Sequence, residues 1–189
     1  MNVNPLYHKT EKALSQELNW INKAKKDPAG FAPLYKEYHE KIFRYVYQRM
    51  NDKDLAFDIT SQVFIKAMNN IHKYEYRGVP FSSWLYRIAK SELYQSFRDK
   101  KAERVVNIES YQLIDVSEEL DCSSLTDKKE ILIEALTKLK DVDIQLVEMR
   151  FFEKRSYREI GDILDLTENN AKVKTFRALE RLKKLVLNK

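Results

Sequence analysis

Glycine and proline, the residues that most often interrupt helices, are scarce in this chain of 189 residues, which contains three glycines and four prolines. Most of them stand together in two short stretches, Pro28 to Pro33 and Gly78 to Pro80, which therefore mark joints between elements. Between the joints, apolar residues recur at the three- and four-residue spacing of amphipathic helices, and no stretch alternates as a strand would. The sequence therefore predicts an all-α fold.

Three helices are predicted in the first half of the chain. The first starts near Phe31, the second near Lys53, and the third follows the segment PFSS, where a serine can cap the first turn. Their helical spacing predicts the buried faces. These faces comprise Phe31, Leu34, Tyr35, Tyr38, Ile42, Tyr45 and Val46, then Ala56, Ile59, Val63, Ala67 and Ile71, then Leu85, Ile88, Ala89, Leu93 and Phe97.

A change in composition divides the chain. From Glu103 to Leu125 acidic residues, serines and isolated aliphatic residues replace the helical pattern, and such a segment cannot bury a core of its own. We therefore predict a flexible acidic linker over residues 103–125, between a helical domain over 20–102 and a second domain over 126–189. Residues 1–19 form an N-terminal extension, either an additional helix or a mobile tail.

The second domain is predicted to have four helices and to end in a helix-turn-helix, within the segment SYREIGDILDLTENNAKVK. Ser156 and Glu159 have the spacing of a capping box at a helix start. Asp165 stands where the turn needs a left-handed residue, which aspartate tolerates better than most, and Thr167 can cap the final helix. The packed positions are Ile131, Ala135, Leu139, Ile144, Val147, Phe151, Ile160, Ile163, Leu164, Ala171, Thr175, Ala178, Leu182 and Leu185.

Charge is distributed unevenly along the chain. The formal net charge is +5, but residues 66–101 and 168–189 each carry +5, while residues 103–127 carry −6. Two basic regions flanking an acidic one favour nucleic acid as a partner. The single cysteine excludes an intramolecular disulfide. Because we find neither a signal peptide nor an apolar run of about 18 residues, we expect a cytoplasmic protein without membrane insertion.

The final helix carries a basic face opposite its packed face. In a helix-turn-helix the amino-terminal part of this helix enters the major groove, where arginine and asparagine pair with base edges and apolar side chains touch thymine methyl groups. The alternatives are a solvated basic face, and a Phe176 that folds back onto the preceding helix. The candidate DNA-binding residues here are Asn170, Lys172, Val173, Lys174, Phe176 and Arg177.

A second basic region with interleaved aromatic residues precedes the linker. Cations that follow a backbone, combined with rings that stack on bases, suit single-stranded nucleic acid. Burial in the core is the alternative for aromatic residues of this region, and it is the favoured one for Phe81 and Trp84; Tyr74 and Tyr94 lie in the loop or on the charged side. The candidate residues are Tyr76, Arg77, Arg87, Lys90, Tyr94 and Arg98.

Taken together, four segments resemble a known family. They are INKAKKDPAGFAPLYKEYHEKIFRYV, DKDLAFDITSQVFIKAMNNI, PFSSWLYRIAKSELYQSFRDKK and LVEMRFFEKRSYREIGDILDLTENNAKVKTFRALERLKKL. In order and spacing, over residues 20–101 and 127–187, they are similar to the extracytoplasmic-function sigma factors of the sigma-70 family. The resemblance implies a factor that binds core RNA polymerase and promoter DNA, with a cognate anti-sigma factor as a possible further partner and no cofactor.

The resemblance also implies roles for particular residues. The helix over residues 54–71 would dock on the clamp of core RNA polymerase, although Thr60, Ser61 and Gln62 stand where the family usually has valine, glutamine and glutamate. The loop from Tyr74 to Pro80 would capture a base flipped from the minus-ten element, and the final helix would read the minus-thirty-five element. The polymerase contacts implied are Asp58, Ser61, Gln62 and Ile65, and the residues that would hold the separating strands are Arg87, Lys90, Tyr94 and Arg98.

Two other classes of function compete with this interpretation. An autonomous helix-turn-helix regulator would bind duplex DNA without polymerase, but it would not need the aromatic and basic region of the first half. An enzyme or a metal site is not expected, because His8, His39 and His72 are scattered and no glycine-rich phosphate loop or nucleophile motif appears.

Overall fold

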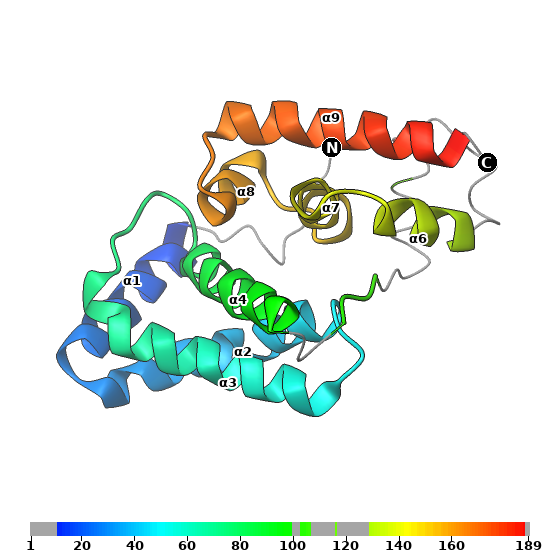
Figure 1. The fold of residues 1–189 in the computed structure, drawn as a ribbon. Coiled ribbons are helices and arrows are strands. Elements are labelled where there is room, and N and C mark those ends of the chain that lie inside the picture. The colour runs from blue at the N-terminus through cyan, green and yellow to red at the C-terminus, as the bar shows by residue number, and fades with distance from the viewer. Residues whose placement is uncertain (1–10, 100–102, 107–115, 117–128, 188–189) are drawn as a thin grey trace. The chain divides into compact units, whose positions relative to one another are not determined.

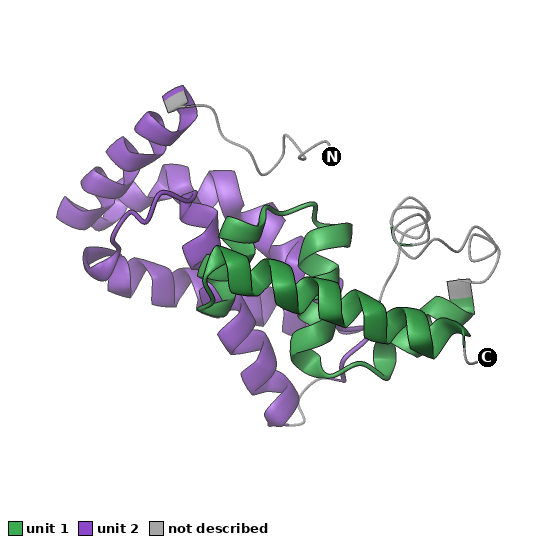
Figure 2. Cartoon of the chain, turned by 90° about the horizontal axis from the view of Figure 1, so that it is seen from above, with its two compact units in different colours: residues 1–7, 106–189 green, residues 8–105 purple. Residues whose placement is uncertain are grey.

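The computed structural model describes residues 11–99, 103–106, 116 and 129–187, and all regular secondary structure among these residues is helical (Figure 1). It divides into two compact units, one within residues 8–105 and one within 106–189 (Figure 2). The predicted all-α fold with two helical domains is thereby confirmed. Cys122, residues 1–10 and most of the predicted linker lie outside the described residues, so the domain boundaries stay predictions.

The amino-terminal unit contains four α-helices and two short 3-10 turns among its described residues. Helix α3 packs against both α2 and α4, and α1 packs against α2 and both 3-10 turns. Helix α1 crosses residue 19, the predicted end of the extension, without a break. In chain order the elements are α1 (Glu11–Lys26), η1 (Pro28–Phe31), α2 (Ala32–Tyr47), α3 (Lys53–Asn70), η2 (Ile71–Lys73) and α4 (Phe81–Arg98).

The core of this unit follows most of the predicted pattern. The predicted inward residues of α3 are all buried, as are those of α2 except Tyr35. Tyr35 is 45% exposed, and its ring packs at the surface against His39 and Phe64. On α4, Tyr86 is buried although it was not among the predicted core residues. Ile88 and Phe97, which were predicted to be buried, are only half-buried. These predictions were wrong because α4 packs with a face rotated toward Tyr86.

Helices α3 and α4 differ in how their N-termini are capped. Asp52 caps α3, since its Oδ1 accepts from the backbone nitrogen of Leu55 at 2.9 Å. A serine cap was predicted for α4, but the helix begins earlier, at Phe81, and its N-cap residue is Pro80, which offers no side-chain acceptor. Ser82 and Ser83 are instead buried in the first turn. The predicted cap is therefore wrong.

The carboxy-terminal unit contains four α-helices within its described residues, as predicted. Helix α7 passes directly into a π-helical turn, η4, which places Phe151 in the core. Helix α9 packs against α6, α7 and α8, and it contributes Ala178, Leu179, Leu182 and Val186 to the same hydrophobic cluster. The elements are α6 (Lys129–Thr137), α7 (Asp141–Val147), η4 (Glu148–Phe152), α8 (Tyr157–Leu164) and α9 (Glu168–Leu187).

Candidate nucleic-acid interface

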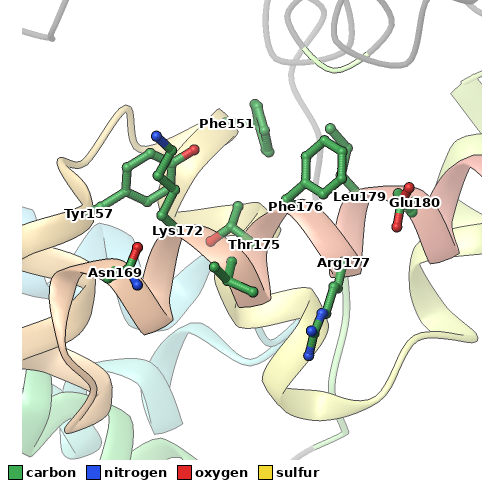
Figure 3. Close-up of a pocket in the computed structure, with 10 residues that line it drawn as sticks. Phe151, Tyr157, Asn169, Lys172, Thr175, Phe176, Arg177, Leu179 and Glu180 are labelled. Atoms are coloured by element: carbon green, nitrogen blue, oxygen red, sulfur yellow. The ribbon is translucent and has the colours of Figure 1, made fainter.

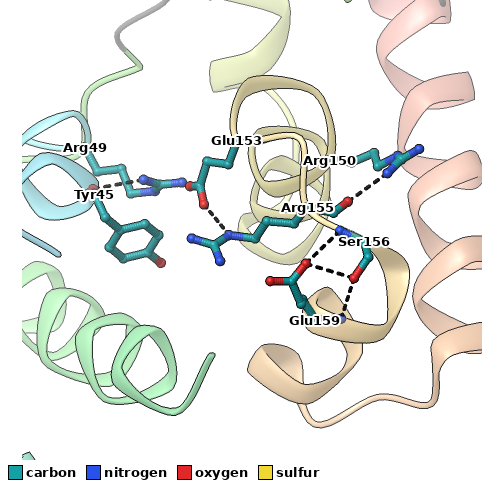
Figure 4. Close-up of polar contacts among 7 residues, drawn as sticks. All are labelled: Tyr45, Arg49, Arg150, Glu153, Arg155, Ser156 and Glu159. Carbon is teal, nitrogen blue, oxygen red and sulfur yellow. Dashed lines mark hydrogen bonds and ion pairs between the residues drawn. The ribbon is translucent and has the colours of Figure 1, made fainter. Parts of the chain in front are cut away.

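A capping box starts α8, as the sequence predicted. The Oγ of Ser156 accepts from the backbone nitrogen of Glu159 at 3.2 Å, and the Oε2 of Glu159 accepts from the backbone nitrogen of Ser156 at 3.1 Å (Figure 4). Arg150 adds a hydrogen bond from Nη1 to the backbone oxygen of Arg155, 2.8 Å away. The two contacts between Ser156 and Glu159 satisfy amide donors that a helix start leaves unpaired and fix where α8 begins.

The turn between α8 and α9 is tight. Asp165 adopts the predicted left-handed conformation, with φ 55° and ψ 45°, and the backbone nitrogen of Leu166 donates to the oxygen of Gly161 at 2.8 Å. Thr167 caps α9 through its Oγ1, which accepts from the backbone nitrogen of Asn170 at 3.2 Å. Sequence and geometry therefore agree on a helix-turn-helix.

An ion pair and a buried stripe hold α9 on the unit. The Nη1 of Arg181 lies 2.9 and 2.8 Å from the two carboxylate oxygens of Asp143 on α7, and Asp143 is buried. The stripe lies on the predicted packed side of the helix. Its buried members are Ala171, Thr175, Ala178, Leu179, Leu182 and Val186.

The opposite face of α9 is open to solvent. Phe176 is 63% exposed and Val173 is 39% exposed, so Phe176 does not fold back into the core. Phe176 instead lines a groove of about 520 Å³ together with Phe151 and Tyr157, whereas the guanidinium of Arg177 points away from these rings (Figure 3). Every residue predicted for this face is exposed, namely Asn170, Lys172, Val173, Lys174, Phe176 and Arg177.

In the amino-terminal unit, the loop before α4 presents Tyr76 and Arg77 to solvent. Tyr76 is 45% exposed and Arg77 is also exposed. Tyr74, by contrast, is 6% exposed, and its ring meets the rings of Phe81 and Trp84 edge-on. Tyr74 is therefore a core residue, and Tyr76 is the aromatic side chain of this loop that a base can reach.

The basic face of α4 continues from this loop. Arg98 is exposed, and Arg87, Lys90 and Tyr94 are half-buried. Arg104, which was not predicted to belong to this surface, lies with its guanidinium 5.5 Å from the centre of the Tyr94 ring and donates a hydrogen bond to the Tyr94 hydroxyl. Because Arg104 stands in the segment interpreted as an acidic linker, no pattern within the sequence connects it with Tyr94.

On α3, the predicted polymerase contacts share an exposed face. Ile65 is 46% exposed, and Asp58, Ser61 and Gln62 are exposed as well. Thr60, one of the departures from the usual family run, is buried, and its Oγ1 donates to the oxygen of Ala56 at 2.7 Å. Of the three departures, Ser61 and Gln62 therefore change the exposed surface, whereas Thr60 changes the core.

Across the described residues, no group of three or more histidine, cysteine, aspartate or glutamate side chains is arranged to hold a metal ion. Within the same part of the chain, no helix is both long enough and apolar enough to cross a membrane.

Comparisons with known proteins identify relatives. Among curated proteins, the chain is similar to the ECF RNA polymerase sigma factor SigM of Bacillus subtilis (strain 168), at 25% identity over 80% of this chain and 92% of SigM. SigW of the same organism is 26% identical over 92% of this chain and 97% of SigW. The ECF sigma factor BldN of Streptomyces coelicolor is 26% identical over 83% of this chain, but the match spans only 60% of BldN.

Solved structures support the same fold. CnrH, solved in complex with the cytosolic domain of CnrY, has a TM-score of 0.61 at 15% identity, over 89% of this chain and 96% of CnrH. The sigma factor RpoE of Bartonella quintana, solved with the anti-sigma factor NepR, has a TM-score of 0.54 at 17% identity, over 82% of this chain and 95% of RpoE.

Two family descriptions match the chain itself. Residues 34–103 match Sigma-70 region 2, and residues 129–184 match Sigma-70, region 4. The first range covers most of α2 together with α3 and α4, and the second covers α6 to most of α9. The chain therefore belongs to the sigma-70 family, in its extracytoplasmic-function (ECF) group.

Proposed function

We propose that this protein is a sigma factor that binds core RNA polymerase, directs it to specific promoters and nucleates promoter melting. The observation that carries the proposal is the presence, in one chain, of an exposed basic helix-turn-helix face and of an exposed Tyr76–Arg77 loop beside a basic helix. The first surface suits duplex DNA and the second suits single strands. A protein with both can recognise a promoter and begin to open it.

The helix-turn-helix reads the upstream element. Asn170 and Arg177 carry side chains that pair with base edges, and Val173 and Phe176 supply apolar contacts for thymine methyl groups. A single module of this kind buries only about 600–1,000 Å² of protein surface on DNA. Occupancy of a promoter against genomic competition therefore depends on attachment to a larger partner.

The loop over residues 74–80 and the basic face of α4 act on the minus-ten element. Opening DNA costs about 1.4 kcal/mol per base-pair step on average, and each base stacked on an aromatic side chain returns about 1–3 kcal/mol. Capture of a flipped base by Tyr76, with Arg87 and Arg98 near the backbone, nucleates opening but cannot sustain a bubble. Polymerase must hold the open state.

The exposed face of α3, with Asp58, Ser61, Gln62 and Ile65, is the surface assigned to core polymerase. Ile65 is an aliphatic side chain that is about half exposed to solvent. Its burial against a partner contributes favourable hydrophobic free energy to binding, which its polar neighbours cannot provide. An anti-sigma factor would be a further protein partner, since two of the similar structures were solved with named partner proteins.

The proposal assigns no catalytic step and no cofactor to this chain, because polymerase makes the bonds. We place its action in the cytoplasm, where promoter DNA and polymerase are found.

The test is a transcription assay with purified core RNA polymerase, this protein and a fragmented bacterial genomic library. We expect start sites that depend on the protein and share two spaced sequence elements, with core polymerase alone as the control. Equal binding of duplex fragments with and without polymerase, together with no new start sites, would instead establish an autonomous helix-turn-helix regulator.

A further inference from the structure

Helix α1 holds both ends of the loop that carries Tyr76. At the first end, the Nζ of Lys25 donates to the backbone oxygen of Tyr74 at 2.7 Å. At the second end, the Oε2 of Glu17 accepts from the backbone nitrogen of Phe81 at 3.2 Å. Glu17 and Lys25 are distant in sequence from Tyr74 and Phe81, and both belong to α1, which also packs against η2.

Glu17 supplies the cap that α4 lacks. Pro80 contributes no side-chain acceptor to the first turn of α4, whose amide groups have no partner within the helix. A carboxylate at this end also meets the positive end of the helix dipole. Glu17 on α1 therefore fixes the point at which the loop ends and α4 begins.

The position of Glu17 is itself fixed. Its side chain is buried, with 1% of the residue exposed, and its Oε1 accepts a hydrogen bond from the hydroxyl of Tyr38 on α2. Burial, followed by the negative charge of Glu17 and the hydrogen bond to it, raises the pKa of the Tyr38 phenol above its ordinary value. Tyr38 therefore stays protonated and remains a donor to Glu17 across the working range of pH.

Between its two anchored ends, the loop combines fixed and exposed positions. Val79 is buried, and Gly78 has a φ of 73°, which favours glycine. Tyr76 and Arg77 are exposed between these points and the anchored Tyr74. A loop held in this way loses less conformational freedom when a base binds, which is the usual benefit of preorganisation.

We propose that Glu17 and Lys25 of α1 are positioning residues for promoter opening, because they hold the Tyr74–Pro80 loop in the conformation that captures an unpaired base. The inference rests on the proposed function. It extends the machinery of opening to a helix outside residues 34–103, the range matched by the region 2 family description. Neither residue needs to touch DNA in this role.

The first test replaces Lys25, which is exposed and can be changed without disturbing the core. Lys25→Met removes the donor to Tyr74 and one positive charge. Lys26→Met is the matched control, since it removes the same charge from the next exposed position of α1. The readout is the rate of promoter opening by the assembled holoenzyme, on a promoter identified in the transcription assay and labelled with a fluorescent base in the minus-ten element.

We expect Lys25→Met to slow opening about fivefold, the equivalent of one ordinary hydrogen bond, while Lys26→Met stays within twofold of wild type. Lys25→Arg retains a donor and should restore most of the rate. The affinity for core polymerase and for the upstream duplex should not change, which separates positioning from a general loss of structure. Equal rates for Lys25→Met and Lys26→Met would overturn the inference and leave the proposed function intact.

Glu17→Gln provides a second variant, because the amide keeps the side-chain volume but removes the charge at the start of α4. We expect slower opening than for Lys25→Met, and faster amide hydrogen exchange at Phe81 in the free protein. Unchanged hydrogen exchange at Phe81 would contradict the anchoring of the loop by Glu17, independently of the rate of promoter opening. Failure of the wild-type protein to open any promoter would overturn the proposed function, and the opening role of α1 would fall with it.

Discussion

Gly161 shows how one residue decides whether the helix-turn-helix can close. A Cβ atom at this position would lie 2.7 Å from the backbone oxygen of Leu166, a separation that real Cβ atoms do not reach. The backbone nitrogen of the same leucine donates to the oxygen of Gly161 at 2.8 Å. Two stretches of backbone therefore touch here, and neither can move away without breaking the turn.

We expect Gly161→Ala to destabilise the protein, although alanine is the better helix former by about 1 kcal/mol. Overpacking of a closed contact costs about 1–3 kcal/mol, and here the opposing atom belongs to the backbone. Urea denaturation measures the free energy of unfolding. An unchanged or increased value would show that the turn can relax, and the argument from close approach would then fail.

At the scale of elements, the helices differ in where their boundaries are encoded. Helix α8 carries its own start signal in Ser156 and Glu159, and α9 carries its signal in Thr167. Helix α4 has no such signal and takes its cap from Glu17, 64 residues earlier in the chain. A self-capped helix should respond to a local substitution in a predictable way.

Ser156→Ala should lower the free energy of unfolding by about 0.5–2 kcal/mol, the usual cost of losing an N-cap side chain. Ser61→Ala is a suitable control, since Ser61 lies inside α3 and its Oγ donates only to the oxygen of Phe57 within the same helix, a bond that contributes little to helix stability. Thermal or urea unfolding of the two variants makes the comparison. A loss from Ser61→Ala as large as that from Ser156→Ala would contradict the capping role.

The same distinction explains which features could be predicted from the sequence. The capping box, the left-handed Asp165 and the exposed Phe176 follow from spacing within a few residues, and each was predicted. The exposure of Tyr35 and the burial of Tyr74 depend on neighbours from other helices, which periodicity alone does not specify. Lys25 and Arg104 were missed for the same reason, because their partners are Tyr74 and Tyr94.

At the scale of the whole molecule, the two units carry different surfaces. The carboxy-terminal unit presents the exposed face of α9, and the amino-terminal unit presents the Tyr76–Arg77 loop together with α4. The proposed function assigns duplex recognition to the first and strand opening to the second. Substitutions in the two units should therefore affect different steps of initiation.

Arg177→Ala should weaken binding of the holoenzyme to the upstream duplex element by about 1–3 kcal/mol, the usual value of a bidentate contact with a base. Tyr76→Ala should leave that binding unchanged and slow opening, through the loss of about 1–3 kcal/mol of stacking. Binding to an upstream duplex fragment and opening of a full promoter are measured separately.

Tyr47→Ala is the control for Tyr76→Ala, since Tyr47 is 41% exposed at the end of α2 and belongs to neither DNA surface. If Tyr76→Ala weakened duplex binding as much as Arg177→Ala, or opened promoters as fast as Tyr47→Ala, the division of labour between the two units would be wrong.

The exposed Phe176 and Val173 also affect the tendency of the purified protein to self-associate. In a free copy of the protein these apolar side chains remain exposed to water. Each copy carries a formal net charge of +5, and the resulting electrostatic repulsion opposes the association of two copies. At physiological ionic strength that repulsion reaches only about 8 Å, and salt also detaches the protein from nucleic acid. A high-salt wash that removes DNA from a preparation therefore also weakens the repulsion between free copies, and we expect it to favour self-association through the exposed face of α9.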